Sequence, residues 1–251
     1  MIPLNERKLG AILLPADPNN LRLEAYLDLG ALPPIPAMHD QGTAVKQPWG
    51  MALNDHLGCC TAAAKKHLVQ AWTACCGREV DLPDAAVLKA YELDGGYNPA
   101  DPNSDHGADL LTCLKNWRAV GIGGHKIDAY AQVGPSSHAH VRAGVYLFGG
   151  LYIGLAMPAA WQKPGAWDIG KGAAFAAGSW GGHCVPVVAY SSAGLVVITW
   201  GARQTLTWAA LKKYGQGVYA PLASMDWIAN NLSPEGFALS ALQADLKAVT
   251  G

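Results

Sequence analysis

The sequence predicts an α+β fold in which helices come first and strands follow. Amphipathic helical patterns dominate residues 61–120, β-branched runs dominate residues 151–222, and no internal repeat links the two parts. Hydrophobic residues make up 51% of the 251 residues and charged residues only 15%, which is enough apolar side chain for a large core. We expect the functional residues to lie where the two parts meet.

A single domain is predicted over residues 1–251. It divides into a helical half at about 51–135, a β half at about 140–222 and a terminal helix at about 233–250. Residues 1–50 are rich in proline and turn residues, which predicts an extended arm lying over the rest of the domain. Fifty residues are short for an inhibitory pro-segment, so we expect this arm to be part of the domain itself.

Three helices are predicted in the first half. The first runs from Thr61 to Cys76 with Gly77 as its stop, because its apolar residues recur at helical spacing. The second runs from about Pro83 to Leu93, with proline at a first-turn position. The third covers Asp109 to Val120. Between the last two lies a long polar loop, residues 94–108, of a size that usually carries function.

Strands dominate the second half, after one further helix from His140 to Phe148. Residues 151–157 read as a buried strand, residues 183–190 and 194–201 as a hairpin, and residues 214–222 as a last strand. Nineteen residues from Ala143 to Trp161 carry no charge, which is near the length of a membrane span. Two glycines at 149–150 split this stretch, so we expect a helix and a buried strand, and no membrane span.

Composition narrows the possible partners and the compartment. The net charge is −1 and no basic stripe interleaved with aromatic residues is present, which argues against nucleic acid as a partner. Six cysteines are too few for a disulfide scaffold in a chain of this length, so reduced thiols are expected. The stretch MIPLNERKLG lacks a basic start followed by an apolar run, so no secretion signal is predicted.

The stretch NDHLGCCTAAAKKH places Cys59 and Cys60 where a loop becomes a helix. The free N–H groups at a helix start lower the pKa of a thiol from about 8.5, which makes Cys60 a candidate nucleophile. Gly58 lets a substrate backbone come close. A nearby imidazole is also needed, and His183 opens a strand directly after Gly182. Cys59 stays an alternative as the functional thiol.

These residues resemble a known family. The segments GCCTAAA, GGHCVPVVAY and VVITWG resemble papain-like cysteine peptidases over about residues 35–222, most closely uncharacterised phage and prophage proteins of that kind. The resemblance implies a helical half packed on an antiparallel β half, with an active-site cleft between them. It implies Cys60 as nucleophile, His183 as base and Asn54 in the oxyanion hole. It implies a peptide or amide substrate and no cofactor.

The family's third catalytic residue is replaced. An asparagine orients the histidine in the family, but Ile198 stands at that position and cannot accept a hydrogen bond. Thr199 is next along and takes the role only if the hairpin shifts register by one residue, since strand neighbours face opposite sides. Asn54 replaces a longer glutamine, and one oxyanion donor is worth about 3 kcal/mol. Trp200 is expected to shield His183 from water.

The sequence also predicts the surroundings of the cleft. We expect Gly58, Gly182 and Trp200 in the cleft, walled by loops 94–108 and 161–182. Trp161, Trp167 and Trp180 either contact substrate or pack inside. Cys184 is expected to point away from the site. The remaining cysteines are expected in the core, and His56, His67, His106 and His125 in loops or on solvated faces.

Several alternatives stay open. A zinc site built from Cys59, Cys60, His183 and Cys184 lacks the usual ligand spacing, so no metal is expected. The chain is either an active hydrolase or a catalytically impaired fold that serves as a binding or structural, phage-derived protein. Acyl transfer to an amine would use the same residues as hydrolysis. A cytoplasmic or virion-associated location is expected, and the sequence does not determine the oligomeric state.

Overall fold

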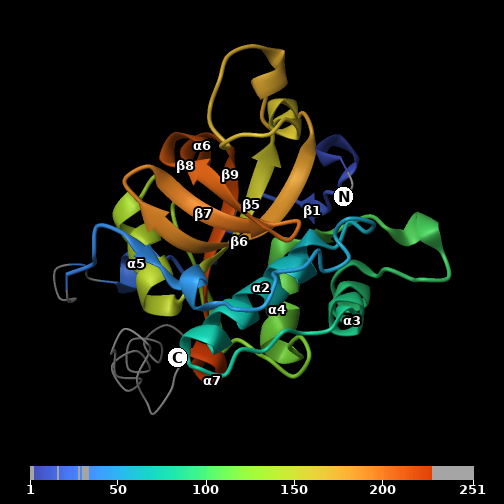
Figure 1. Ribbon diagram of the computed structural model, residues 1–251, viewed down its shortest axis with the longest axis horizontal. Coiled ribbons are helices and arrows are strands. Elements are labelled where there is room, and N and C mark those ends of the chain that lie inside the picture. Colours follow the sequence, from blue (N-terminus) through green and yellow to red (C-terminus); the bar gives the residue numbers. More distant parts are fainter. Residues whose placement is uncertain (1–2, 16, 28, 30–33, 228–251) are drawn as a thin grey trace.

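The computed structural model describes residues 3–15, 17–27, 29 and 34–227. A layer of helices packs against one antiparallel sheet, with the helices below the sheet in Figure 1. The helical layer consists of α2 (Cys60–Cys75), α3 (Asp84–Gly95) and α4 (Leu110–Ala119). This arrangement confirms the α+β class. The terminal helix predicted at 233–250 lies outside the described residues.

The sheet follows the strand order β4-β9-β5-β6-β7-β8, and each of these neighbouring pairs is antiparallel. Its strands are β4 (Ala129–Gln132), β5 (Leu151–Met157), β6 (Gly181–Ser191), β7 (Gly194–Thr199), β8 (Ala202–Thr207) and β9 (Gly215–Leu222). A short strand, β2 (His39–Asp40), also pairs with β6. Strand β4 lies within the range predicted as helical, so the sheet begins earlier than the sequence suggests.

Smaller elements complete the described chain. Helix α5 (His138–Phe148) covers one side of the sheet, and α6 (Trp208–Tyr214) connects β8 to β9 (Figure 1). The chain also contains α1 (Leu23–Tyr26), α7 (Ser224–Trp227), β1 (Ala11–Ile12) and β3 (Ala108–Asp109). Single 3-10 turns occur at Leu4–Glu6, Gln41–Ala44, Pro102–Ser104, Ala159–Gln162 and Ala173–Phe175. Strands β1 and β3 pair in parallel, which joins the N-terminal arm to the helical layer.

Helix α2 is the centre of the molecule, and its residues 60–73 are all buried. It is enclosed by α3 and α4 on one side and by β6 on the other. Its buried cations are paired, since Lys65 Nζ lies 2.6 Å from Asp94 and Lys66 Nζ lies 2.9 Å from Asp81. His67 is also buried, with 2% exposed, so its prediction as a loop or solvated residue is wrong.

The uncharged stretch from 143 to 161 does not form one long helix. Helix α5 ends at Phe148, and Gly149 follows at φ 71°, where an added Cβ would lie 2.5 Å from Trp227. Strand β5 then begins at Leu151, and all its residues are buried. Among the described residues, no helix is long and apolar enough to cross a membrane. The predicted helix followed by a buried strand is confirmed.

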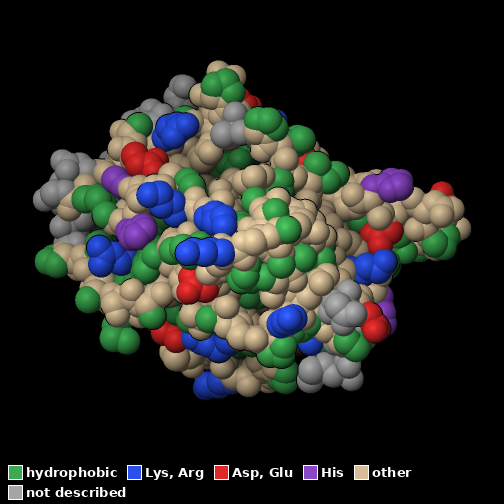
Figure 2. Space-filling view, turned by 90° about the horizontal axis from the view of Figure 1, so that it is seen from above, with side chains coloured by type: hydrophobic (Ala, Val, Ile, Leu, Met, Phe, Trp, Pro, Cys, Tyr) green, Lys and Arg blue, Asp and Glu red, His purple; other side chains and the backbone are tan. Residues whose placement is uncertain are grey.

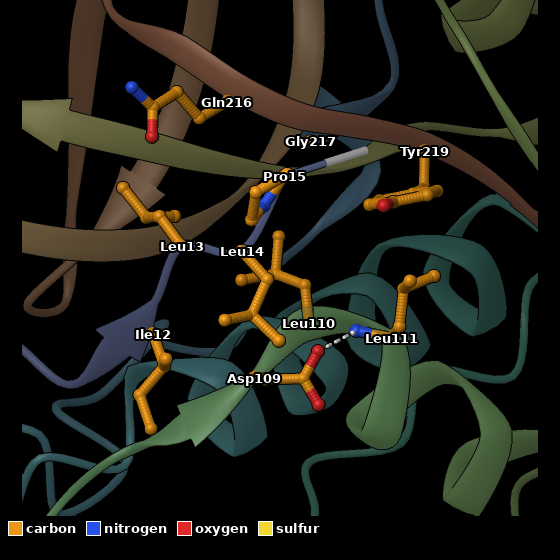
Figure 3. Close-up of a pocket in the computed structure, with 10 residues that line it drawn as sticks. All are labelled: Ile12, Leu13, Leu14, Pro15, Asp109, Leu110, Leu111, Gln216, Gly217 and Tyr219. Atoms are coloured by element: carbon orange, nitrogen blue, oxygen red, sulfur yellow. Dashed lines mark hydrogen bonds between the residues drawn. The ribbon is translucent and has the colours of Figure 1, made fainter. Parts of the chain in front are cut away.

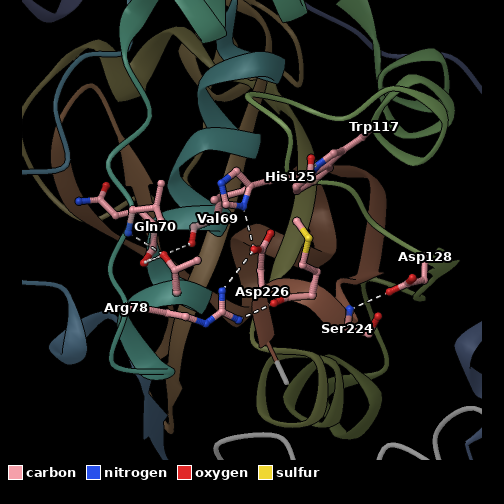
Figure 4. Close-up of polar contacts among 11 residues, drawn as sticks. Val69, Gln70, Arg78, Trp117, His125, Asp128, Ser224 and Asp226 are labelled. Carbon is pink, nitrogen blue, oxygen red and sulfur yellow. Dashed lines mark hydrogen bonds and ion pairs between the residues drawn. The ribbon is translucent and has the colours of Figure 1, made fainter. Parts of the chain in front are cut away.

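Helix α7, at the end of the described chain, makes polar contacts with residues of the helical layer (Figure 4). Asp226 is buried, and one of its oxygens lies 2.7 Å from His125 Nδ1 and 3.9 Å from Arg78. The backbone N–H of Ser224 donates to Asp128 at 2.7 Å. Burial raises the pKa of Asp226, and its hydrogen bond with His125 opposes that rise. These polar contacts therefore stabilise the packing of α7 against Arg78 and His125.

Candidate active site

Cys60 is the first residue of α2, and its side chain is almost completely buried. Its sulfur accepts the backbone N–H of Cys184 at 3.3 Å, across the boundary between helix and sheet. Cys184 immediately follows His183, so the thiol meets the strand at the residue next to the imidazole. The Cys184 side chain packs into the cluster around α2 and α4. That cluster also contains Cys60, and the Cys60 thiol is among the groups that raise the pKa of Cys184, after burial.

The loop before Cys60 is held in a strained conformation. Ala52 and Leu53 have φ angles of 52° and 61°, and residues with side chains rarely adopt such values. The Cys59 thiol donates to the carbonyl of Ala52 at 3.4 Å, and Asn54 Nδ2 donates to the carbonyl of Leu57 at 2.9 Å. Cys59 therefore ties the loop together, while Cys60 faces the strand that carries His183.

His183 is fixed by one hydrogen bond and one aromatic ring. Its Nε2 lies 2.8 Å from Thr199 Oγ1, and its ring stacks on Trp200 at 4.5 Å with an interplanar angle of 16°. Its Nδ1 is buried and has no hydrogen-bond partner among the described residues. Trp200 has φ 47°. Among the described residues, Ala52, Leu53 and Trp200 are the three non-glycine residues with positive φ. Backbone strain thus gathers on both sides of the thiol and imidazole.

A β-bulge explains why Thr199, and not Ile198, meets the histidine. The pairing of β6 with β7 shifts by one residue between Val187 and Ala189. Ile198 is buried in a separate cluster with Trp49 and Val188, on the other side of the strand. The sequence predicts contact with Thr199 only if the register shifts by one, and a one-residue shift of this kind is present in the sheet.

Burial keeps both reactive groups neutral at pH 7. It raises the pKa of the Cys60 thiol to about 11, although backbone N–H groups of Cys184, Gly10 and Thr61 oppose the rise. Burial also lowers the pKa of His183 to about 3. The thiolate and imidazolium forms are therefore disfavoured in this conformation, and the cause is exclusion of water from the pair.

The N-terminal arm packs against the residues that surround the thiol and imidazole. We call residues 7–15 the covering segment, because they lie across the thiol and imidazole. Gly10 donates its N–H to the carbonyl of Gly182 at 3.2 Å and accepts the N–H of Ala108 at 2.8 Å. The indole of Trp200 donates to the carbonyl of Lys8 at 3.3 Å, and Arg7 lies over the Trp200 ring at 5.4 Å. The segment thus bridges both walls of the cleft.

The fit at Gly10 is close. A Cβ added to Gly10 would lie 1.8 Å from the carbonyl oxygen of Gly58, and one added to Gly182 would lie 2.0 Å from the carbonyl of Ala11. The predicted cleft residues Gly58, Gly182 and Trp200 therefore all contact the covering segment. The sequence predicts an arm here but not its place over Cys60, and the glycine inside the apolar run KLGAILLP was the available clue.

Residues 12–15 continue the covering segment along the cleft (Figure 3). They line a small pocket together with the start of α4 and with β9, and Leu14 and Leu110 lie side by side in it. Asp109 is turned to cap α4 and accepts the N–H of Leu111 at 2.9 Å. Only a narrow crevice is left between the segment and this part of the wall.

Two of the three tryptophans in loop 161–182 belong to the core. Trp161 and Trp167 are 3% exposed and stack on each other at 5.0 Å. Trp167 also meets the His183 ring edge-on at 6.5 Å. Trp180 is only partly buried and lies 5.7 Å from Trp200. The sequence left open whether these tryptophans contact substrate or pack in the core, and the structure shows that Trp161 and Trp167 pack in the core.

Neither a metal cluster nor a single-sign surface stands out. Among the residues that the structure describes, no three His, Cys, Asp or Glu side chains are grouped to hold a metal ion. On the face in Figure 2, Lys and Arg side chains are interspersed with Asp and Glu. The zinc alternative therefore has no geometric support within the described part of the chain.

The fold is that of known cysteine proteases. No family model matches the chain, and no curated protein matches it by sequence. The structure is similar to xylellain, a cysteine protease from Xylella fastidiosa, with a TM-score of 0.64 at 15% identity over 87% of this chain and 97% of that one.

Two further structures support the same fold. Procathepsin B S9 from Trypanosoma congolense is similar with a TM-score of 0.56 at 10% identity, over 88% of this chain and 89% of that chain. The Carica candamarcensis cysteine protease CMS1MS2, solved in complex with E-64, gives 0.53 at 14% identity, over 75% and 99%. The chain has a papain-like fold, as its sequence predicts.

Proposed function

We propose that this chain is a cysteine hydrolase that cleaves an amide or peptide bond. One observation carries the proposal most directly: the thiol at the start of α2 meets the strand residue next to a buried imidazole. That imidazole is held by Thr199 and Trp200 and keeps Nδ1 without a partner among the described residues. A buried nitrogen without a hydrogen-bond partner destabilises the fold, so such atoms are often kept for catalysis. Accepting the proton of the Cys60 thiol would be such a role for Nδ1.

The reaction would run through an acyl-enzyme. His183 takes the proton of Cys60, and the thiolate attacks the carbonyl carbon to form a C–S bond. The imidazolium then gives its proton to the leaving nitrogen as the C–N bond breaks. Water attacks the thioester with His183 as base, which releases a carboxylic acid and restores the thiol. Thr199 would hold the imidazole in orientation during both proton transfers.

Asn54 and the backbone N–H of Cys60 would stabilise the oxyanion. An amide nitrogen carries two hydrogens, and the carbonyl of Leu57 receives one from Asn54 Nδ2. We assign the second to the substrate oxygen. Because Asn54 is buried and its loop is held by Cys59, the donor would be oriented before the substrate arrives.

The structure corresponds in this proposal to a resting form. Substrate and the covering segment need the same glycine-lined space, so the segment has to leave before a peptide enters. Its departure would also admit water to Cys60 and His183. The burial that now holds the thiol and imidazole neutral would then decrease, which favours the ion pair.

A second reading is a catalytically impaired fold used for binding or structure. The observation that favours it is the hydroxyl of Thr199 in place of a carboxamide beside His183. Acyl transfer to an amine would require the same residues as hydrolysis. A phage or prophage origin and a cytoplasmic or virion-associated location stay predictions from the sequence.

Hydrolysis of a mixed peptide library by the full chain, followed by mass spectrometry, tests the proposal. Cys60→Ala and Cys59→Ala form a matched pair, because both thiols are buried and adjacent. We expect cleavage by the wild type, slower but measurable cleavage by Cys59→Ala because Cys59 holds the Asn54 loop, and none by Cys60→Ala. If the wild type cleaves no peptide and Cys60 reacts with iodoacetamide like an ordinary thiol, the hydrolase proposal is wrong. The binding or structural role then takes its place.

A further inference from the structure

Asp105 connects two parts of the cleft that are far apart in the sequence. It lies in loop 94–108, and its carboxylate accepts the backbone N–H of Gly58 at 2.9 and 3.2 Å through its two oxygens. One of these oxygens also accepts the hydroxyl of Tyr91 at 2.6 Å. Asp105 therefore holds the loop that leads into Cys60 against helix α3.

Tyr91 carries the connection one step further. Its hydroxyl oxygen accepts the backbone N–H of Gly107 at 2.9 Å, and its side chain is completely buried. The hydrogen bonds thus form one chain from Gly58 through Asp105 and Tyr91 to Gly107. Each member has a defined partner, as expected for a rigid polar network.

The two ends of this chain are the glycines that enclose the covering segment. An added Cβ on Gly10 would lie 1.8 Å from the carbonyl of Gly58, and one on Gly107 would lie 2.1 Å from the carbonyl of Gly10. Gly58 and Gly107 therefore both lie in close contact with Gly10, which accounts for the tight fit of the covering segment at this point.

Building on the proposed function, we propose that Asp105 is a positioning residue for the reaction at Cys60. With Tyr91, it holds Gly58 at a fixed distance from Gly107 and fixes the peptide planes that lead into α2. The N-cap residue of α2, Cys59, makes no side-chain capping bond to the helix. The bonds of Cys59 and Asn54 tie the preceding loop to itself, and Asp105 ties that loop to helix α3 through Tyr91. Loss of the tie would misplace the thiol and the backbone N–H next to it.

The role is geometric and not a matter of charge. A carboxylate opposes the ionisation of a nearby thiol, and Asp105 is among the groups that raise the pKa of Cys59, after burial and Cys60. The groups that shift the pKa of Cys60 are burial and backbone N–H groups. A negative charge here therefore does not help the nucleophile. Asparagine keeps the acceptor oxygen and removes the charge, so Asp105→Asn separates the two roles.

Steady-state peptide hydrolysis by full-length variants tests this inference. We expect Asp105→Ala to lower kcat by about 10- to 100-fold with little change in KM, since it leaves the Gly58 N–H unpaired. Asp105→Asn should stay within about threefold of the wild type, and Tyr91→Phe should fall between the two. Asp101→Ala is the matched control, because that carboxylate lies in the same loop but, among the residues that the structure describes, accepts only the backbone N–H of Asn103.

Amide hydrogen exchange at Gly58 and Gly107 provides the second readout. The inference requires faster exchange at both glycines in Asp105→Ala and wild-type exchange in Asp101→Ala. Equal kcat in Asp105→Ala and the wild type, or equal losses in Asp105→Asn and Asp105→Ala, would overturn it. If the wild type cleaves nothing, the proposed function fails separately. Exchange and the rate of Cys60 alkylation then decide whether Asp105 positions this loop.

Discussion

Two buried histidines allow a structural and a candidate catalytic role to be compared within one chain. His67 lies in the middle of α2, and His183 lies near the start of β6. Both are at most 2% exposed, and both lie against a tryptophan. Burial lowers the pKa of each, to about 4 for His67 and about 3 for His183, so both are neutral at pH 7.

Their hydrogen bonds differ. His67 Nε2 lies 2.9 Å from the backbone carbonyl of Trp49, and its ring meets the Trp49 ring edge-on at 88°. His183 instead meets a side-chain hydroxyl, stacks face to face on Trp200 and leaves Nδ1 unpaired among the described residues. The contrast teaches that burial alone does not mark a functional histidine. A fixed backbone partner indicates a structural role, while a buried nitrogen without a partner makes His183 the candidate for chemistry.

Replacing each histidine by alanine should separate these roles most strongly. We expect His183→Ala to reduce peptide hydrolysis by about 1000-fold or more, because His183 is the base in the proposed mechanism. His67→Ala should instead lower the free energy of unfolding by about 1–3 kcal/mol and leave the activity of the folded fraction within about twofold. Urea denaturation and kcat/KM, measured on both variants, check the contrast. An inactive but stable His67→Ala would contradict it.

The next largest effect concerns the segment that covers His183 but not His67. Gly10→Ala places a Cβ against the carbonyl of Gly58, so we expect the covering segment to leave and Cys60 to react about 10- to 100-fold faster with iodoacetamide. Ile12→Ala, at an exposed position of the same segment, is the control. Site-resolved mass spectrometry measures both rates. Equal rates in the two variants would mean that the segment does not limit access.

A smaller effect is expected from removing the Thr199 hydroxyl, which contacts His183, whereas His67 contacts a backbone carbonyl. Thr199→Val keeps the shape of the side chain and removes the acceptor from His183 Nε2, which should reduce kcat about tenfold. Thr199→Ser keeps the hydroxyl and should stay within about threefold. The pH profile of kcat/KM is the check, because loss of the partner should also shift the limb that belongs to His183. Unchanged profiles would remove Thr199 from the mechanism.

The smallest expected effect is the change in the free energy of unfolding with pH. Both histidines have folded pKa values below the ordinary value of about 6.5, so the unfolded chain binds more protons at acidic pH. Their stabilisation is complete above pH 6.5 and is lost as pH falls toward about 4 and about 3. Each contributes a slope of up to about 1.4 kcal/mol per pH unit. Urea midpoints of His67→Ala between pH 7 and 4.5 should show a shallower slope than the wild type.

Local patterns carried most of the fold prediction. Helices α2, α3 and α4 appear within two residues of their predicted bounds, because apolar spacing, a proline and a glycine mark them in the sequence. Strand β5 matches its predicted range as well. Strands β4 and β8 were not predicted, since much of their surface is exposed or half-buried and they depend on pairing with β9 and β7.

The site was harder to predict, because long-range contacts build it. A cysteine at a helix start and a histidine at a strand start are visible as short motifs. The acceptor for His183 depends on a bulge near Val188, and no local pattern predicts which strand will carry an extra residue. Asp105 and Tyr91 look like ordinary loop and helix residues in the sequence, and only the folded chain shows that they connect Gly58 to Gly107.

The α+β class, the helix that begins at the thiol and the strand that carries the imidazole can all be predicted from local sequence patterns. Periodicity and turn residues act within a few positions of the chain, so they can be read directly. The tertiary structure decided that Thr199 meets His183, that residues 7–15 cover the pair and that both groups are neutral. These outcomes depend on burial and on contacts between distant residues, and burial exists only once the chain has folded.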